Sequence, residues 1–263
     1  MQLLARTKRR VELTEPGRQF LASAREILAQ ADRAVAQVQR EARGEVGEIA
    51  IGMVSSASYG DTLPRVLRVY RERHPSVAIT LHEMSSGEQQ TALREGRIQV
   101  GFLRPPLHEP GLATTTVLRE PLVAVLPADH PLASRKRIPL AALAGDPFIL
   151  IPRSHGLGHL DLVMGACLRA GFTPRIAQEA REIQTVVGFV AAGFGVSLLP
   201  ETVQRLTHSG VAYVPLTPPK VLIEIAAAHR SGDASPLLAA FLAVLKETVS
   251  ASRSGAKRAG VSN

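Results

Sequence analysis

The sequence of 263 residues contains no tryptophan, a single cysteine, and aromatic residues at only 4%. One cysteine cannot form a disulfide within the chain, which excludes a scaffold that depends on disulfide bonds. Cys167 lies in an apolar helical pattern, where a thiol packs as a small apolar side chain. No run of about 18 apolar residues is present, so no membrane-spanning helix is predicted. The N-terminus carries no charged-then-apolar leader either, and we therefore expect a soluble, cytoplasmic protein without a membrane partner.

The signatures of common enzyme classes are missing as well. The sequence has neither the Gly-x-x-x-x-Gly-Lys-Ser/Thr loop of nucleotide-binding proteins nor the Gly-x-Ser-x-Gly elbow of hydrolases. Gly193-x-Gly195 lacks the third glycine of a dinucleotide-binding turn. Ser154 and His155 are adjacent, and adjacent side chains rarely point together as a nucleophile and its base. We therefore expect no enzymatic activity and no cofactor.

Two histidines and an aspartate have the spacing of a metal site. His155, His159 and Asp161 could bind a metal if both histidines shared one helix face. Gly156 and Gly158 lie among them and disfavour that helix. We therefore expect no metal site here.

Positive charge is concentrated at both ends of the chain. The net charge is +8, and residues 1–43 contribute +4 through nine Lys or Arg against five Asp or Glu. Residues 251–263 contribute +3 without an acidic residue. The basic N-terminal segment predicts contact with phosphate groups, with a solvated run of charge as the alternative. The Ser-, Gly- and Ala-rich C-terminal segment is predicted to be disordered.

A long amphipathic helix is predicted after the basic N-terminal segment. Thr14 supplies a capping side chain, and Pro16 fits a first helical turn. Apolar residues then recur every three or four positions, and they are Phe20, Leu21, Ala24, Ile27, Leu28, Ala31, Val35 and Val38. Gly44 and Gly47 end this pattern. Because an isolated helix of this length is marginal in water, we expect the apolar stripe to pack against a second copy of the chain, with packing on its own domain as the alternative.

Three strands, each followed by a helical pattern, indicate a parallel sheet after this helix. They are predicted at residues 47–54, 77–83 and 98–102. Hydroxyl residues and one arginine directly follow the strands, and they are Ser55, Ser56, Ser85, Ser86 and Arg104. Ligands of such sheets bind beyond the carboxyl ends of the strands. Helix N-termini with serine hydroxyls, together with a guanidinium group, therefore predict an anion site, with simple helix capping as the alternative role of the serines.

The strand and helix pattern restarts in the second half of the chain. Strands are predicted at residues 147–151 and 175–178, with helices at 159–169 and 183–192. This indicates a second α/β unit. The last predicted helix, at residues 236–249, has an apolar side that could cover the first unit.

The residues before the long helix place basic side chains between two short apolar pieces. Their pattern is Leu3-Leu4-x-Arg6-x-x-Arg9-x-Val11-x-Leu13-Thr14-x-x-Gly17, which predicts a small hairpin with its tip at residues 7–10. Joined to the long helix, this pattern resembles the wing and linker of LysR-type transcriptional regulators. The helix-turn-helix that precedes the wing in that family is not in this sequence. We therefore expect a chain truncated at its N-terminus, either as an expressed fragment or through a late start codon.

Two later segments strengthen this resemblance, so that it covers about residues 3–250. Residues 121–132 are similar to the strand and turn at the family's first crossing between subdomains, and residues 188–200 to its glycine-punctuated helix-to-strand junction. The resemblance implies an α/β fold with two Rossmann-like subdomains of the type II periplasmic-binding-protein kind, preceded by a remnant wing and a dimerisation helix. The implied parts are a partial wing at 1–16, a linker helix at 17–46, subdomain I at 47–121 and 224–250, subdomain II at 122–223, and a disordered basic tail at 251–263.

The function implied by the resemblance is effector-dependent transcriptional regulation. Arg6, Lys8, Arg9 and Arg10 would contact promoter DNA, and the chain would assemble as a homodimer or homotetramer. It looks most like the regulators of aromatic-compound degradation that sense muconate or benzoate, so the implied effector is a small aromatic or dicarboxylic acid. The implied effector-binding residues are Ser55, Ser56, Ser85, Ser86, Arg104, Pro152, Ser154, His159 and Ile183. His159 stands where an aromatic wall is common in that branch, and a more polar ligand than benzoate is the alternative.

Two other function classes share this two-lobed frame. A periplasmic-type solute-binding protein for a small organic anion would have a signal peptide and no dimerising helix. An enzyme on a similar frame would need a charged catalytic cluster in the cleft, where only Arg104 is clearly predicted. The sequence therefore favours the regulator.

Overall fold

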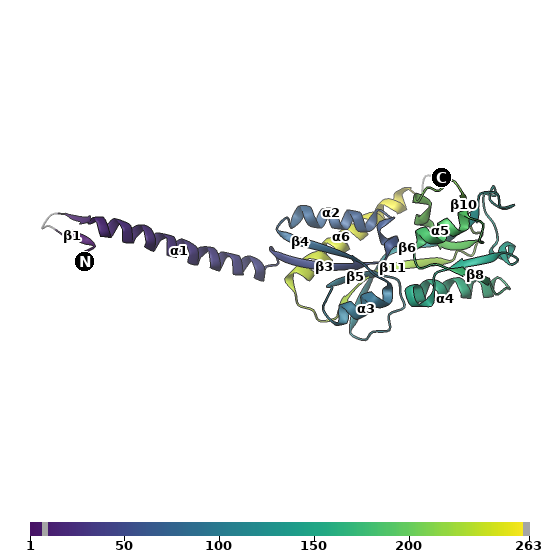
Figure 1. Ribbon diagram of the computed structural model, residues 1–263, viewed down its shortest axis with the longest axis horizontal. Coiled ribbons are helices and arrows are strands. Elements are labelled where there is room, and N and C mark those ends of the chain that lie inside the picture. The colour runs from purple at the N-terminus through teal and green to yellow at the C-terminus, as the bar shows by residue number, and fades with distance from the viewer. Residues whose placement is uncertain (7–9, 260–263) are drawn as a thin grey trace.

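The structure is a computed structural model that describes residues 1–6 and 10–259. A long helix, with a short hairpin at its free end, extends from a body made of two lobes (Figure 1). Within the described residues, no helix is both long and apolar enough to span a membrane.

The hairpin lies at the free end of the long helix. Strands β1 (Leu4–Arg6) and β2 (Val11–Leu13) pair antiparallel, as predicted. The predicted basic tip, with Lys8 and Arg9, lies outside the described residues. The N–H of Thr14 donates to the carbonyl of Leu3 at 3.1 Å, which joins the hairpin to the start of the helix.

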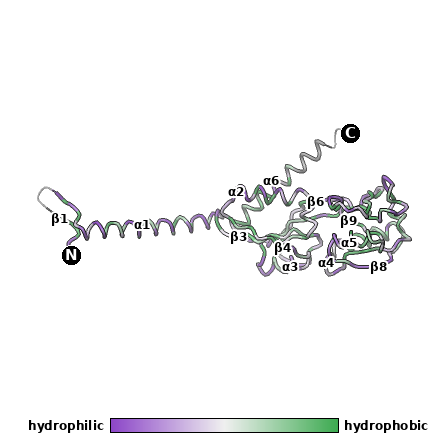
Figure 2. The backbone as a smooth tube through the Cα atoms, turned by 45° about the horizontal axis from the view of Figure 1, so that its top comes forward, coloured by the Kyte–Doolittle hydropathy of each residue, from purple (hydrophilic) through white to green (hydrophobic). Residues whose placement is uncertain are grey.

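Helix α1 (Glu15–Ala42) begins where the capping pattern predicted. The hydroxyl of Thr14 accepts a hydrogen bond from the Gly17 N–H at 3.1 Å, and Pro16 occupies the first turn. Five apolar side chains of the stripe are 58% to 65% exposed, and they are Phe20, Ile27, Leu28, Val35 and Val38. Figure 2 shows apolar and polar residues alternating along this helix. The stripe therefore does not pack on its own domain, within the part of the chain that the structure describes.

The first lobe contains the predicted parallel strands. These are β3 (Gly47–Met53), β4 (Val77–Glu83) and β5 (Val100–Leu103), in the order β5-β3-β4. The helical elements between them are the 3-10 turn η1 (Ser55–Ser58), α2 (Thr62–Arg73) and α3 (Ser86–Arg94). Because strand side chains alternate between faces, Phe102 enters the core beneath α2, and Leu103 the core beneath α3.

Two long strands belong to both lobes. Strand β6 (Leu112–Pro127) pairs antiparallel with β11 (Leu222–Arg230). Both are part of one sheet with the order β10-β6-β11-β5-β3-β4, in which β10 is Val211–Pro215. Val117 of β6 lies in the first core, whereas Leu122 lies in a core of the second lobe. The apolar run at residues 120–126 predicts only the second half of β6 as a strand, since the Thr-rich first half lacks a clear apolar pattern.

The second lobe is the second α/β unit that the sequence predicted. Its elements are η2 (Leu140–Leu143), β7 (Pro147–Leu150), α4 (Arg153–Arg169), β8 (Arg175–Glu179), α5 (Ile183–Ala191), β9 (Ser197–Pro200), η3 (Glu201–Arg205) and β10 (Val211–Pro215). Cys167 is fully buried among apolar side chains, as predicted, and burial raises the pKa of its thiol to about 11.

Helix α4 begins earlier than the sequence predicted. It starts at Arg153 rather than at His159, so Gly156 and Gly158 do not interrupt it. Gly158 lies where the two lobes touch. A Cβ at this position would overlap the carbonyl oxygen of Pro105. Close backbone approach thus requires glycine here and outweighs its weak helix propensity.

Helix α6 (Pro236–Ala259) packs on the first lobe, as predicted (Figure 1). Its Phe241 is fully buried, with ring centroids 5.1 Å from Tyr70 and 6.3 Å from Phe102. The predicted disordered tail from residue 251 is wrong as far as Ala259, because α6 continues through it. Once the buried turns of α6 have formed, Ala, Arg and Lys residues can extend the helix without a new nucleation step.

The contact between α6 and the first lobe can be tested with two phenylalanines. Phe241→Ala should lower the free energy of unfolding by about 3–5 kcal/mol, because it leaves a cavity between α6 and the sheet. Phe194 is 55% exposed, and Phe194→Ala should cost less than about 1 kcal/mol. Urea unfolding of both variants measures the difference, and equal losses would contradict the role of α6.

Candidate functional site

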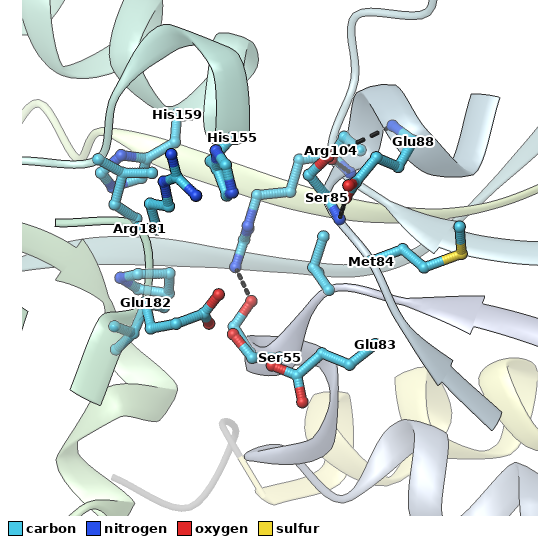
Figure 3. A pocket seen from close by; sticks show the side chains of 16 residues that line it. Ser55, Glu83, Met84, Ser85, Glu88, Arg104, His155, His159, Arg181 and Glu182 are labelled. Carbon is cyan, nitrogen blue, oxygen red and sulfur yellow. Dashed lines mark hydrogen bonds between the residues drawn. The ribbon is translucent and has the colours of Figure 1, made fainter. Parts of the chain in front are cut away.

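A cavity lies at the carboxyl ends of β3, β4 and β5, between the two lobes (Figure 3). Its volume is about 130 Å³. An apolar cavity of about 150 Å³ can hold benzene, so this one suits a compact small molecule. The first lobe contributes Val54, Ser55, Ser56, Glu83, Met84, Ser85, Ser86, Glu88 and Arg104, and the second contributes Ile151, His155, His159, Arg181, Glu182, Ile183 and Pro200.

Seven of the nine predicted effector residues line this cavity. They are Ser55, Ser56, Ser85, Ser86, Arg104, His159 and Ile183. Pro152 and Ser154 do not line it, because α4 begins at Arg153 and leaves Ser154 exposed on its first turn. The nine predicted residues leave out five charged or titratable residues that line the cavity, and they are Glu83, Glu88, His155, Arg181 and Glu182. Most of these lie within two residues of a predicted site residue along the chain. This proximity was the signal in the sequence that could have identified them.

The buried side chain of Arg104 lies in the middle of the site. It is 7% exposed, and in Figure 3 it extends between His155 and Ser55. Its Nη2 donates to the hydroxyl of Ser56 at 2.9 Å, and its Nη1 donates to the carbonyl of Glu224 at 3.3 Å. Its backbone N–H donates to the hydroxyl of Ser86 at 3.1 Å. A guanidinium has five N–H groups, so three remain without a partner among the described residues.

The charge of Arg104 is not neutralised at close range. No carboxylate oxygen of the described residues lies within 4.0 Å of its guanidinium. Burial lowers the pKa of Arg104 to about 10, an effect that the nearby charge of Glu120 partly offsets. The carboxylate of Glu120 instead accepts from the N–H and hydroxyl of Thr202, at 2.8 and 3.3 Å. Arg104 therefore stays cationic at neutral pH, with unused donors in a buried cavity, which favours an anionic ligand.

The sequence predicted that the serine clusters bind an anion at helix N-termini, and the structure gives these serines other roles. At α3, the Ser85 hydroxyl accepts from the Glu88 N–H at 3.3 Å, and the Glu88 carboxylate accepts from the Ser85 N–H at 2.8 Å. This capping box places a negative charge at the helix N-terminus and uses two of its N–H donors, those of Ser85 and Glu88. After β3 there is only the four-residue turn η1, whose dipole is small. The hydroxyls of Ser56 and Ser86 each accept from Arg104, and their own O–H groups are left to donate.

His159 forms the buried part of the opposite wall. It is 2% exposed, and its Nε2 lies 3.0 Å from the carbonyl oxygen of Leu198. Burial, together with the charge of Arg104, lowers the pKa of His159 to about 4, although the hydrogen bond to Leu198 opposes the shift. The imidazole is therefore neutral at pH 7. A carbonyl oxygen only accepts, so Nε2 carries the proton.

The residues considered for a metal have other partners. His155 and His159 do lie in one helix, contrary to the expectation from the glycines. The carboxylate of Asp161 pairs with Arg153 at 2.7 Å, on the exposed side of α4. Among the residues that the structure describes, no group of three or more His, Cys, Asp or Glu side chains is arranged to hold a metal.

The two lobes also contact each other beside the cavity. The guanidinium of Arg205, from η3, makes a bidentate ion pair with the carboxylate of Asp61 at 2.5 and 2.6 Å. Gly158 of α4 lies against Pro105 of the first lobe, as described above. The width of the cavity is therefore set by how closely these lobes approach.

Comparison with known proteins identifies the family. The profile of the LysR substrate binding domain matches residues 42–250, which is most of the chain. The chain belongs to the LysR family of transcriptional regulators. The regulator AlsR from Bacillus subtilis is 39% identical over 241 residues, covering 91% of this chain and 79% of AlsR.

Solved structures of LysR-family regulators have the same fold. The crystal structure of the regulator CbnR is similar to this chain with a TM-score of 0.78 and 30% identity, over 92% of this chain and 84% of CbnR. The effector-binding domain of BenM, a regulator from Acinetobacter baylyi, was solved with its effector benzoate and gives a TM-score of 0.69 and 33% identity, over 82% of this chain and 95% of that domain. These findings confirm the predicted two-lobed effector fold and favour neither an enzyme nor a solute-binding protein.

The buried histidine of this LysR-family regulator predicts a stability loss in mild acid. The pKa of His159 is about 4 in the folded state and about 6.5 in the unfolded chain. The unfolded state therefore takes up a proton first, and stability is lost as the pH falls from 6.5 towards 4. Between pH 7 and 5 this costs about 2 kcal/mol.

Urea unfolding of the wild type and His159→Gln at pH 7 and 5 measures this loss. The Gln variant should lose about 2 kcal/mol less between the two pH values. His82 is exposed on β4, and His82→Gln should behave as the wild type. A wild-type pH dependence in the His159 variant would contradict the assignment of a buried, neutral imidazole.

Proposed function

We propose that this LysR-family regulator senses a small carboxylic acid in the cavity between its lobes. The observation that carries the proposal is the buried guanidinium of Arg104, which has three N–H groups without a partner among the described residues. A carboxylate would satisfy two of them as a bidentate ligand. Ser56 and Ser86 would donate their hydroxyl groups to the same anion, and Ser55, Ser85, His159 and Ile183 would complete the wall.

The size of the cavity and the effector of BenM support a compact acid. The volume of about 130 Å³ is close to that needed for a single small ring. Benzoate, the effector of BenM, carries one carboxylate on one ring. Glu83, Glu88 and Glu182 place carboxylates around the cavity, so a second negative charge on the ligand would be repelled unless Arg181 offset it. We therefore favour a monocarboxylic acid over a dicarboxylic one.

We propose that the lobes hinge where β6 and β11 pass from one core to the other, at residues 121/122 and 223/224. The packing supports these positions, since Leu118 and Ile225 pack in the first lobe and Leu122 and Ile223 in the second. An acid held by Arg104 from one lobe and by the second-lobe wall would favour one lobe arrangement. Helix α1 would pass this change to the DNA-binding end.

We further propose that the protein acts in the cytoplasm on promoter DNA. The hairpin at the end of α1 carries Arg6 and Arg10, with Lys8 and Arg9 in the tip outside the described residues. Basic residues in this position would contact phosphates, which adds affinity more than sequence specificity. The exposed stripe on α1 would join two such hairpins in a homodimer, and two dimers could form a tetramer.

A thermal-shift assay tests the acid sensor. Benzoate, propionate and cis,cis-muconate should be compared with benzamide, which has the shape of benzoate without its charge. We expect a saturable rise in Tm with a monocarboxylate and none with benzamide. Ser56→Ala and Arg104→Ala should weaken acid binding about 10- to 100-fold, through loss of charge-assisted hydrogen bonds.

The matched control for this assay is Arg135→Ala. Arg135 is an exposed arginine in the turn after β6, away from the cavity. This variant should bind the acid as the wild type does. Arg104→Ala also removes hydrogen bonds to Ser56 and Glu224, so this variant can unfold. In that case the affinity of Ser56→Ala for the acid tests whether the cavity binds an anion. Equal shifts with benzamide and benzoate would overturn the proposal of an anion sensor.

The dimer is tested on the stripe of α1. Leu28 and Val35 are 65% and 58% exposed and lie seven residues apart, as in a coiled-coil seam. The double variant Leu28→Glu with Val35→Glu should halve the mass measured by light scattering, because two carboxylates would face their counterparts. Gln30→Glu with Gln37→Glu makes the same charge change on the opposite face and should leave the mass unchanged. An unchanged mass in the first variant would contradict dimerisation through α1.

A further inference from the structure

One buried hydrogen-bond acceptor in the cavity is not used by the described residues. Because Nε2 of His159 donates to the carbonyl of Leu198, its Nδ1 presents a lone pair. This Nδ1 is buried and has no hydrogen-bond partner among the described residues. His159 also lines the cavity, so this acceptor belongs to a residue of the ligand site.

An acceptor in this state requires a donor. More than nine in ten buried polar groups in proteins are hydrogen-bonded, and leaving one unpaired is costly. Protonation of Nδ1 would not resolve this at neutral pH, because burial and Arg104 hold the pKa of His159 near 4. A donor group of a ligand in the cavity would supply the missing partner.

The charge of Arg104 selects the kind of donor. A cationic ammonium group beside His159 would be repelled by the guanidinium, whose charge already disfavours the imidazolium. A neutral hydroxyl donates without that cost. The carboxylate of the same ligand would be attracted to Arg104, so the two walls of the cavity recognise two different groups.

We propose that the effector is a small hydroxycarboxylic acid, whose carboxylate binds Arg104 and whose hydroxyl donates to Nδ1 of His159. This inference rests on the proposed acid sensor and specifies its ligand class. Arg104 belongs to the first lobe and His159 to the second, so a ligand with both groups would connect the lobes directly. An acid without the hydroxyl would fill the same cavity but leave the acceptor on the second lobe unpaired.

Matched pairs of acids test this inference by isothermal titration calorimetry on the whole chain. The pairs are propionate and lactate, benzoate and 3-hydroxybenzoate, and phenylacetate and mandelate. In at least one pair the hydroxylated acid should bind about tenfold more tightly or better, because a ligand that lacks the hydroxyl leaves a buried acceptor unpaired. The comparison uses the wild type, so it does not depend on how a variant folds.

A variant and a spectroscopic signal then assign the effect to His159. His159→Leu should bind both members of the preferred pair with equal affinity, whereas His82→Leu should keep the wild-type preference. In ¹⁵N NMR, the resonance of the unprotonated Nδ1 should shift when the hydroxylated acid binds and should shift less with its partner. This signal distinguishes a hydrogen bond to Nδ1 from a hydroxyl that contacts a serine instead.

The possible results separate the two proposals. Binding of both members of every pair with equal affinity would overturn the hydroxyl inference and leave the acid sensor intact. A preference that persists in folded His159→Leu would also overturn it. If no acid of any pair binds, the acid sensor itself fails, and the hydroxyl inference fails with it.

Discussion

The buried guanidinium of Arg104 is the interaction on which the site depends. It ties together three segments that are far apart in the sequence, through Ser56 after β3, Ser86 at the start of α3, and the carbonyl of Glu224 in β11. A buried cation without a carboxylate partner is costly, and proteins retain such a group when a ligand supplies the counter-charge. The cavity is therefore built around a charge that the chain itself does not neutralise at close range.

The shared strands explain why this charge lies at a junction between lobes. Because β6 and β11 belong to both lobes, the sheet of the first lobe continues into the second, and the carboxyl ends of β3, β4 and β5 face α4 and α5 across the cavity. Contacts such as Arg205 with Asp61, and Gly158 with Pro105, bring the walls together on either side. A ligand that binds both walls would therefore favour one arrangement of the lobes.

Much of the fold was readable from local patterns. The cap at Thr14, the apolar repeat of α1, the parallel strands of the first lobe and the return of α6 were all predicted at nearly their observed positions, because each follows from periodicity or capping within one segment. Two of the errors were in segments whose contacts are with distant parts of the chain. In α4, the close approach of Pro105 requires a glycine at position 158, and the first half of β6 is a strand because β11 pairs with it.

The sequence by itself determined the family, the two α/β units, the exposed stripe of α1 and the chemical character of the site, because hydrophobic period, capping residues and motif spacing are local. Only the tertiary structure decided how the site residues act. It left Ser154 outside the cavity, and it left Nδ1 of His159 without a partner among the described residues. Burial, hydrogen-bond partners and pKa all depend on which segments meet in space, and no local pattern in a chain records those contacts.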